Sequence, residues 1–193
     1  MRLEPRVLEN RFVRLEPMSP AHRADLRAAC EADPVIWTQL YPYSLYGEHF
    51  DSGWARLYAP PASDRINYAV MAEGRCVGVS SFLRIDVAEG SLEIGGTYYR
   101  PEFRGGVTNP AAKRLLMAAA FDGGVRRVSF RVDALNARSR AAVLKLGAVQ
   151  EGIMRQDRVV WTGRVRDTVV FSVLADEWPA VRGRLDERLA AFG

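Results

Sequence analysis

The stretch with the strongest chemical signal is residues 104–110, "RGGVTNP", which combines an arginine, two glycines and an Asn-Pro pair. The pair favours a helix start, with Asn109 as N-cap and Pro110 at the first helical position. Unpaired N–H groups in a first helical turn attract anions, and glycines let the backbone approach a ligand closely. The stretch can therefore form a diphosphate cradle from Arg104, Gly105, Gly106, Val107, Thr108 and Asn109.

Taken alone, this loop is better interpreted as an ordinary connection between a strand and a helix, because many short glycine motifs bind nothing. The chain contains neither a G-x-x-x-x-G-K-[ST] nucleotide loop nor a G-x-G-x-x-G dinucleotide fingerprint. The interpretation of the loop thus depends on the elements that surround it.

Two strands and a second helix are predicted around the loop. Residues 91–100 read as the strand before it, and the paired Gly95 and Gly96 indicate a bulge or a close backbone approach. Residues 126–133 alternate and predict the strand that follows the loop's helix. Residues 136–147 predict the next helix, with Asn136 as N-cap and Gly147 as the stop residue. The unit over 92–133 is then a strand–helix–strand crossover, which pairs its two strands in parallel.

The remaining pattern predicts an α+β fold with a mixed, mostly antiparallel central sheet and flanking helices. Strands are expected at 11–16, in a hairpin over 66–86 turning at Glu73-Gly74, and in a hairpin turning at Thr162-Gly163. Helices are expected from the Ser19-Pro20 cap to about Ala32, in part of 35–61, and from Pro179 onward, where the apolar face would comprise Val181, Leu185, Leu189 and Phe192. "YAPPAS" at 58–63 is expected to be an internal loop, so residues 1–193 should form a single domain.

Composition excludes several classes of protein. The net charge is +4, and 25 of the 27 basic residues are arginine, scattered without the dense cluster that nucleic-acid binding usually needs. No stretch is long and apolar enough for a membrane span, and the N-terminus has no signal-peptide core, so a cytoplasmic location is expected. The distant Cys30 and Cys76 and the two histidines make a metal site unexpected.

Several segments, in order over residues 8–178, resemble the GCN5-related N-acetyltransferase (GNAT) superfamily, and more closely its RimJ/RimL-like branch. "LENRFVRLEPMSPAH" resembles that branch's first strand and helix start. "LEIGGTYYRPEFRGGVTNPAAKRLLMAAAF" resembles the strand, pyrophosphate loop and helix that hold acetyl-CoA. "RVSFRVDALNARSRAAVLKLGAVQEGIMR" resembles the strand, N-x-x-S helix and following strand, and "GRVRDTVVFSVLADEW" resembles the closing strand.

One residue departs from the family pattern. The loop of the superfamily usually reads R/Q-x-x-G-x-G/A, and Val107 stands where the second glycine is usual. A residue with a Cβ must adopt a backbone conformation that this atom permits. The detailed geometry of the loop is therefore open, although its placement is not.

The resemblance implies an enzyme that transfers an acetyl group from acetyl-CoA to a primary amine, possibly a protein N-terminal amine, by direct attack on the thioester. It implies a backbone N–H near Tyr98 and Tyr99 as the donor to the thioester carbonyl, and Ser139 as general acid or sulfur ligand. Asn136 would cap its helix and bind the pantetheine arm. The base is open between Glu93 and Asp157, each of which could instead be an ion-pair partner of an arginine.

An aromatic-rich segment over 37–58 resembles the wall of the family's acceptor groove. Tyr41, Tyr43 and Tyr46 are spaced too irregularly for one helical stripe and are expected to line the acceptor site. The acceptor itself is open between a small molecule and a protein N-terminus, and a homodimer stays open because dimers are common in that branch. A transferase using a larger donor such as succinyl-CoA, a non-catalytic acyl-CoA sensor and a basic nucleic-acid-binding module are the competing hypotheses.

Overall fold

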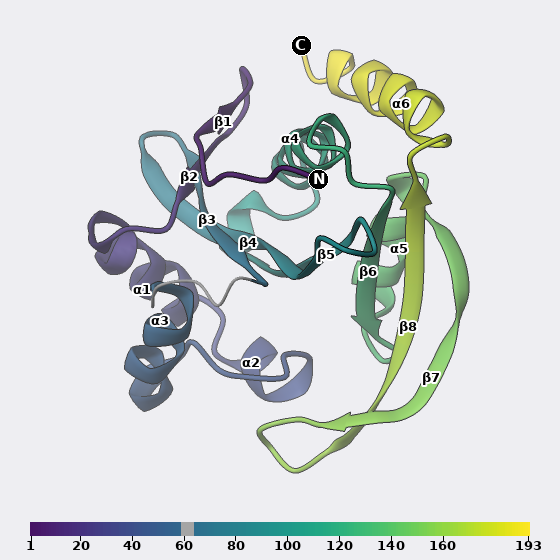
Figure 1. The fold of residues 1–193 in the computed structure, drawn as a ribbon. Helices are drawn as coiled ribbons and strands as arrows, with labels where there is room; N and C mark the ends of the chain where they lie inside the picture. Colours follow the sequence, from purple (N-terminus) through teal and green to yellow (C-terminus); the bar gives the residue numbers. More distant parts are fainter. Residues whose placement is uncertain (59–63) are drawn as a thin grey trace.

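The computed structural model describes residues 1–58 and 64–193, and its centre is one eight-stranded sheet with the order β1-β2-β3-β4-β5-β6-β8-β7 (Figure 1). All neighbouring strands pair antiparallel except β5 and β6, which pair in parallel, as the crossover predicts. The strands are β1 (Leu8–Glu9), β2 (Arg14–Pro17), β3 (Ile66–Ala72), β4 (Arg75–Asp86), β5 (Ser91–Tyr99), β6 (Arg127–Asp133), β7 (Val149–Val159) and β8 (Val165–Leu174). The predicted α+β fold class is therefore confirmed.

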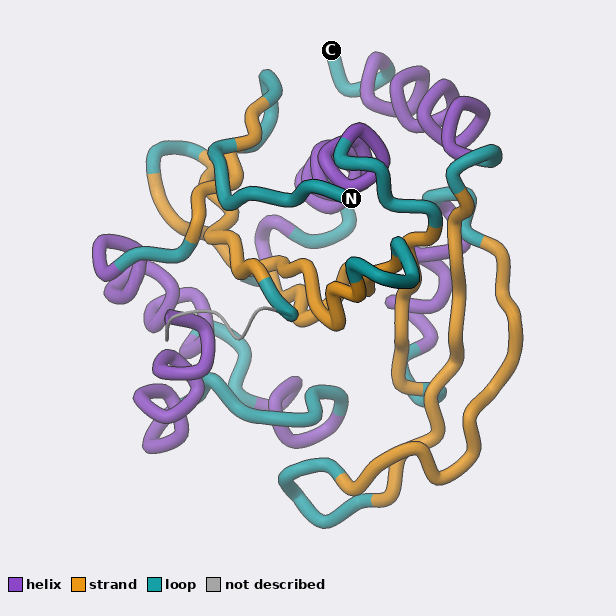
Figure 2. Tube along the Cα trace, viewed as in Figure 1, coloured by secondary structure: helices purple, strands orange, loops and turns teal. Residues whose placement is uncertain are grey.

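Helices cover both faces of this sheet (Figure 2). Helices α4 (Thr108–Asp122), α5 (Ala137–Lys145) and α6 (Trp178–Ala190) pack on one face, over the larger apolar core. Helices α1 (Arg23–Glu31), α2 (Val35–Gln39) and α3 (Phe50–Tyr58) pack on the other face, where a second core forms over β3, β4 and β5. No helix of the described ranges is long and apolar enough to cross a membrane.

The parallel pair opens after three residues. Ser91–Glu93 of β5 pair with Arg127–Ser129 of β6, and no register is formed beyond them. Both strands continue, β5 to Tyr99 and β6 to Asp133, so they diverge and leave an opening between them. A bulge in β5 accompanies the divergence: the register with β4 shifts between Val79 and Ser81, and Gly96 has a φ of +59°. The bulge predicted from the paired glycines is thus confirmed.

Three sequence-based boundaries were wrong. The first strand, expected at 11–16, covers only Arg14–Pro17, because the Asn10 side chain accepts hydrogen bonds from Phe12 and Val13 and holds a turn there. Helix α4 begins at Thr108 with Val107 as N-cap, so Pro110 occupies the third helical position, where its missing N–H costs nothing. Phe192 lies beyond the end of α6 and is exposed. The loop expected at 58–63 falls mostly on residues 59–63, which lie outside the described residues.

Candidate active site

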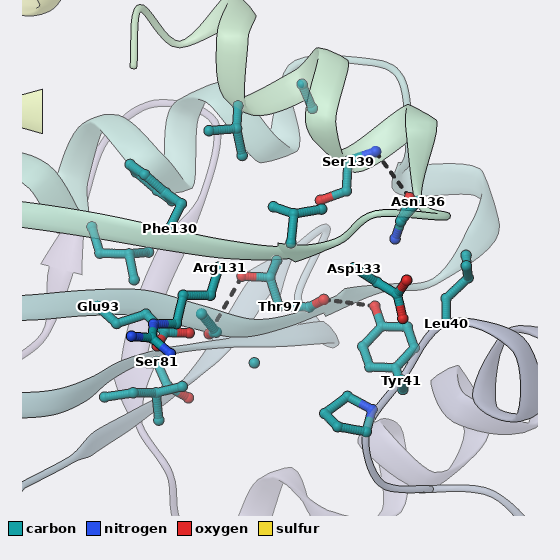
Figure 3. A pocket seen from close by; sticks show the side chains of 18 of the residues that line it. Leu40, Tyr41, Ser81, Glu93, Thr97, Phe130, Arg131, Asp133, Asn136 and Ser139 are labelled. Atoms are coloured by element: carbon teal, nitrogen blue, oxygen red, sulfur yellow. Dashed lines mark hydrogen bonds and ion pairs between the residues drawn. The ribbon is translucent and has the colours of Figure 1, made fainter. Parts of the chain in front are cut away.

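A cavity of about 1160 Å³ occupies the opening between β5 and β6. Its walls come from the segment between α2 and α3, from β4, β5 and β6, from the loop before α4, and from α5, β7 and β8. Figure 3 shows Glu93 and Arg131 at one side of this space, and Tyr41, Asp133 and Asn136 at the other. The candidate residues named from the sequence can be placed against this cavity one group at a time.

The loop before α4 presents a run of free backbone donors. Among the described residues, the N–H groups of Gly105, Gly106, Val107, Thr108 and Asn109 have no hydrogen-bond acceptor, and the first helical bond runs from Ala111 N–H to Val107 O. A Cβ added at Gly105 or Gly106 would meet no atom within 4 Å, so the space above the loop is open. Consecutive free N–H groups at the start of a 15-residue helix form an anion site.

Val107 does not strain this loop. Its φ of −73° and ψ of −26° lie in the right-handed helical region, which any residue adopts. The position that needs glycine is Gly105, with a φ of +81°. The departure from the family pattern is therefore compatible with the loop's geometry.

Arg104 is largely engaged by the protein itself. Its Nε donates to Tyr99 O at 2.6 Å, its Nη1 donates to the Asp33 carboxylate, and its guanidinium carbon lies 5.1 Å from the centre of the Tyr98 ring. Only Nη2 has no partner among the described residues, although it is buried. Arg104 thus anchors the loop to β5 and to Asp33, which follows α1.

On β5, the backbone N–H of Tyr99 points toward the opening between β5 and β6. Arg100 N–H donates to Val77 O at 2.9 Å, and Gly78 lies directly opposite Tyr99. Because hydrogen-bonded and non-hydrogen-bonded pairs alternate in an antiparallel ladder, the N–H and C=O of Tyr99 point away from β4, toward the opening. The Tyr98 side chain faces the second core instead, where its hydroxyl donates to Ala29 O at 2.7 Å, and it does not line the cavity.

Asn136 and Ser139 form the local motif that the sequence predicted. Asn136 Oδ1 accepts the Ser139 N–H at 2.9 Å, which confirms Asn136 as the N-cap of α5. Gly147, with a φ of +96°, lies two residues beyond the last helical residue and confirms the predicted stop. Both Asn136 and Ser139 line the cavity, and the Ser139 hydroxyl has no hydrogen-bond partner among the described residues.

Glu93 and Asp157 both line the cavity, but their surroundings shift their pKa values in opposite directions. Burial raises the pKa of Glu93, against the opposing pull of Arg84, whose Nε lies 3.1 Å from the carboxylate, and of Arg131. Burial also acts on Asp157, but the Thr168 hydroxyl at 2.8 Å and the neighbouring arginines outweigh it and lower its pKa. Of the two carboxylates, Glu93 is therefore the one with a raised proton affinity.

Two of the three tyrosines expected at the acceptor wall reach the cavity. Tyr41 donates its hydroxyl to Thr97 O at 2.6 Å, and burial raises its pKa. Burial also raises the pKa of Tyr43 to about 12, and its hydroxyl would lie 3.4 Å from a Cβ placed on Gly96. Tyr46 does not line the cavity and is 37% exposed, because it precedes a short 3₁₀ helix on the surface.

Sequence reasoning missed Lys113, which lines the cavity from α4. The side chain is buried, and Nζ donates to Ser80 Oγ at 2.9 Å and to Thr97 Oγ1 at 2.6 Å. No carboxylate of the described residues lies within ion-pair distance, and burial lowers the pKa of Lys113 to about 7. A signal was available, because Lys113 falls on the same helical face as the apolar Leu116, Met117 and Ala120.

Comparison with known proteins gave consistent matches. The profile of the family described as "Acetyltransferase (GNAT) domain" matches residues 13–149. A curated relative from Bacillus subtilis (strain 168), named "Putative ribosomal N-acetyltransferase YdaF", is 29% identical over 134 residues, which are 69% of this chain and 71% of the relative.

Solved structures agree over most of the chain. The structure of a GCN5-related N-acetyltransferase from Brucella melitensis is 32% identical, with a TM-score of 0.89 over 96% of this chain and 86% of the other. The structure described as RimL, ribosomal L7/L12 alpha-N-protein acetyltransferase in complex with coenzyme A, has a TM-score of 0.78 over 89% of this chain and 99% of the other. At 16% identity, that second likeness concerns the fold alone.

Proposed function

The chain belongs to the acetyltransferase (GNAT) family, and from this premise we propose that it transfers an acetyl group from acetyl-CoA to the α-amine of a protein N-terminus. The general activity, acetyl transfer, follows from membership of the family. The finer part, the protein acceptor, is supported by the Bacillus relative, which is named as a putative ribosomal N-acetyltransferase. An acceptor of that kind also favours the cytoplasmic location expected from the sequence.

One observation supports the proposal most strongly. The loop whose backbone N–H groups have no acceptor among the described residues lines the same cavity as the edge of β5 that diverges from β6. The five N–H groups of residues 105–109 bind the diphosphate of the co-substrate, and the unpaired edge of β5 runs from that loop toward Glu93. Asn136, the N-cap of α5, lines the same space, and its amide N–H₂, which has no acceptor among the described residues, binds the pantetheine arm. Acetyl-CoA, when bound, supplies an acetyl group activated as a thioester.

Each step of the transfer then has a residue to serve it. The Tyr99 N–H donates to the carbonyl oxygen on which negative charge develops. Glu93 lies six residues from Tyr99 along β5, roughly 20 Å away, so it takes the proton of the attacking amine through a chain of water molecules. The amine's own pKa of about 7.7–8.0 makes this a modest task. The Ser139 hydroxyl donates to the departing sulfur, and Asp157 stays ionised as a partner of Thr168 and Arg158. Tyr41 and Tyr43 form the wall against which the acceptor lies.

We also propose that residues 1–193 form a single domain. Strands from both ends of the chain, β1 and β8, belong to the same sheet, and α6 packs on the core that α4 covers. A cut between two independent units would have to separate paired strands.

Calorimetric titration with acetyl-CoA and a thiol-release assay with N-terminal peptides and small amines test the proposal. We expect binding in the micromolar range, release with peptides, and a sharp fall in release for Ser139→Ala. The matched control is Ser52→Ala, because Ser52 is exposed on α3 and does not line the cavity. Absence of acetyl-CoA binding would overturn the proposal, whereas binding without release for any amine would leave an acyl-CoA sensor.

A further inference from the structure

One half of the cavity is rich in arginine, and the sheet places that half on the face away from α4 and α5. Residues alternate between faces along a strand. Leu92 and Ile94 of β5 belong to the core under α4, so Glu93 between them points to the opposite face. By the same alternation, β6 places Arg131, between the core residues Phe130 and Val132, on that opposite face. Strand β8 places Arg166 there too, because it lies an odd number of residues before the core residue Val169. We call this half, where the acceptor amine would enter, the acceptor chamber.

Four arginines belong to the acceptor chamber, namely Arg84, Arg131, Arg158 and Arg166, and the first three share two carboxylates. Glu93 pairs with Arg84 at 3.1 Å and with Arg131 at 3.8 Å. Asp157 pairs with Arg158 at 3.3 Å and with the same Arg131 at 3.8 Å. Arg131 is thus shared between both carboxylates, and two positive charges remain without a counter-charge.

Arg166 is the most confined of the four. It is 6% exposed, and its Nε donates to the Thr168 hydroxyl at 3.0 Å. The nearest carboxylate, Asp133, lies 3.8 Å away and is bound more closely by Arg164, at 2.5 Å. A buried guanidinium without its own carboxylate is costly unless something else supplies the negative charge.

Two further arginines face the chamber across Tyr43. Arg56 lies on α3, with its guanidinium carbon 5.6 Å from the centre of the Tyr43 ring, and Arg65 directly precedes β3. Within the described part of the chain, neither has a carboxylate within 4.0 Å. The chamber therefore holds six arginines. Asp133 is already paired with Arg164, so the carboxylates that remain are those of Glu93, Asp157 and the exposed Asp64, three in all.

The geometry points to an acceptor that carries a negatively charged group close to its reacting amine, and specifically to a peptide N-terminus with an acidic side chain at its second or third residue. This inference rests on the proposed function, since it names the class of amine that the same site receives. Guanidinium groups bind carboxylates through paired charge-assisted hydrogen bonds, and a surplus of positive charge in a cavity steers anions into it. The diphosphate of acetyl-CoA is bound elsewhere, by the loop at 105–109.

The test compares peptides that differ only in charge. Peptides beginning Ala-Asp-Glu, Ala-Asn-Gln and Ala-Lys-Lys are assayed for acetyl transfer and, separately, for binding to the protein in the presence of coenzyme A. We expect kcat/KM for the acidic peptide to exceed that for its amide counterpart by about tenfold or more, since hydrogen bonds to charged groups are the stronger ones. The basic peptide is expected to be the poorest substrate of the three.

A double variant, Arg56→Gln with Arg65→Gln, tests the source of the preference. Neither arginine takes part in an ion pair of the described residues, so the variant should fold, and the acidic-to-neutral ratio should fall by about tenfold. The control, Arg2→Gln with Arg182→Gln, removes the same charge from side chains that are 87% and 57% exposed, and should keep the ratio. A control that lowers the ratio equally would reduce the effect to net charge and overturn the assignment.

Further arms separate the sources of the negative charge. Free aspartate and glutamate probe a small amino acid as acceptor, and a peptide with phosphoserine at its second residue probes phosphate. Higher turnover of the free amino acids than of the acidic peptide would overturn the peptide assignment, as would equal binding of acidic and amide peptides. Preferential binding of acidic peptides without any transfer would instead refute the proposed transfer to a peptide N-terminus and leave the chamber's specificity standing.

Discussion

Replacing Lys113 by methionine should change how the stability of the protein depends on pH. The side chain is buried, no carboxylate in residues 1–58 and 64–193 pairs with it, and burial lowers its pKa from 10.5 to about 7. The unfolded chain therefore binds more protons than the folded chain between these two values. Since stability rises with pH wherever the unfolded state holds more protons, the lysine weakens the fold progressively as the pH falls from 10.5 toward 7.

The magnitude follows from the two pKa values. Between pH 9 and pH 7, the wild-type free energy of unfolding should fall by about 2 kcal/mol more than that of Lys113→Met. Methionine has a similar length and no charge, and the Ser80 and Thr97 hydroxyls, 2.8 Å apart, can still bond each other. All other titrating groups are common to both proteins, so their contributions cancel in the difference.

The assay is urea unfolding of both proteins at pH 7, 8 and 9, with the difference in unfolding free energy plotted against pH. Circular dichroism first establishes that the variant is folded. Parallel curves for the two proteins would refute the reasoning, because they would mean that Lys113 keeps an ordinary proton affinity in the folded state. A slope of the opposite sign would indicate a counter-charge that stabilises the ammonium.

Three other predictions concern single contacts. Gly78→Ala should destabilise the protein by about 1–3 kcal/mol in urea unfolding, because the new Cβ would lie 2.1 Å from Tyr98 O, and an unchanged midpoint would contradict the packing described. Asn136→Ala should lower the free energy of unfolding by about 1 kcal/mol through loss of the α5 cap. Asn136→Asp keeps an acceptor for the Ser139 N–H and should retain most of that stability. Equal losses of stability in both variants would exclude the cap as the cause. In the pH–rate profile of the wild-type protein, activity should fall at acidic pH with a midpoint above the ordinary glutamate pKa of 4.5, since activity requires the ionised Glu93 carboxylate. Glu93→Gln should abolish this acidic limb, and an unchanged limb would assign the base to another residue.

Local features of the site could be predicted from the sequence because each depends on neighbours in the chain. The capping bond from Asn136 to Ser139 spans three residues, and the bulge at Gly95 and Gly96 needs only the absence of side chains. The parallel pairing of β5 with β6 follows from the crossover between them. The resemblance to a known family then supplied what these local signals lacked, the expectation that they serve one cofactor.

Other features could not be predicted, because they depend on contacts between distant parts of the chain. Arg104, expected as a free phosphate-binding fork, is held by Asp33, 71 residues away. Tyr46 was expected in the acceptor wall, but the path of the chain before α3 leaves it on the surface. Helix α4 starts at Thr108, before its Asn-Pro signal, and the backbone of Val107 already has helical dihedral angles.

The sequence by itself determined most of the elements and their order, since periodicity, caps and glycines act over a few residues. Only the tertiary structure decided the electrostatics of the site. It gave Glu93 and Asp157 opposite pKa shifts, buried Lys113 with no carboxylate of the described residues within ion-pair distance, and gathered six arginines around one chamber. The physical reason is that charge energetics depend on burial and on distances of a few ångströms between strands, which no local pattern in the chain records.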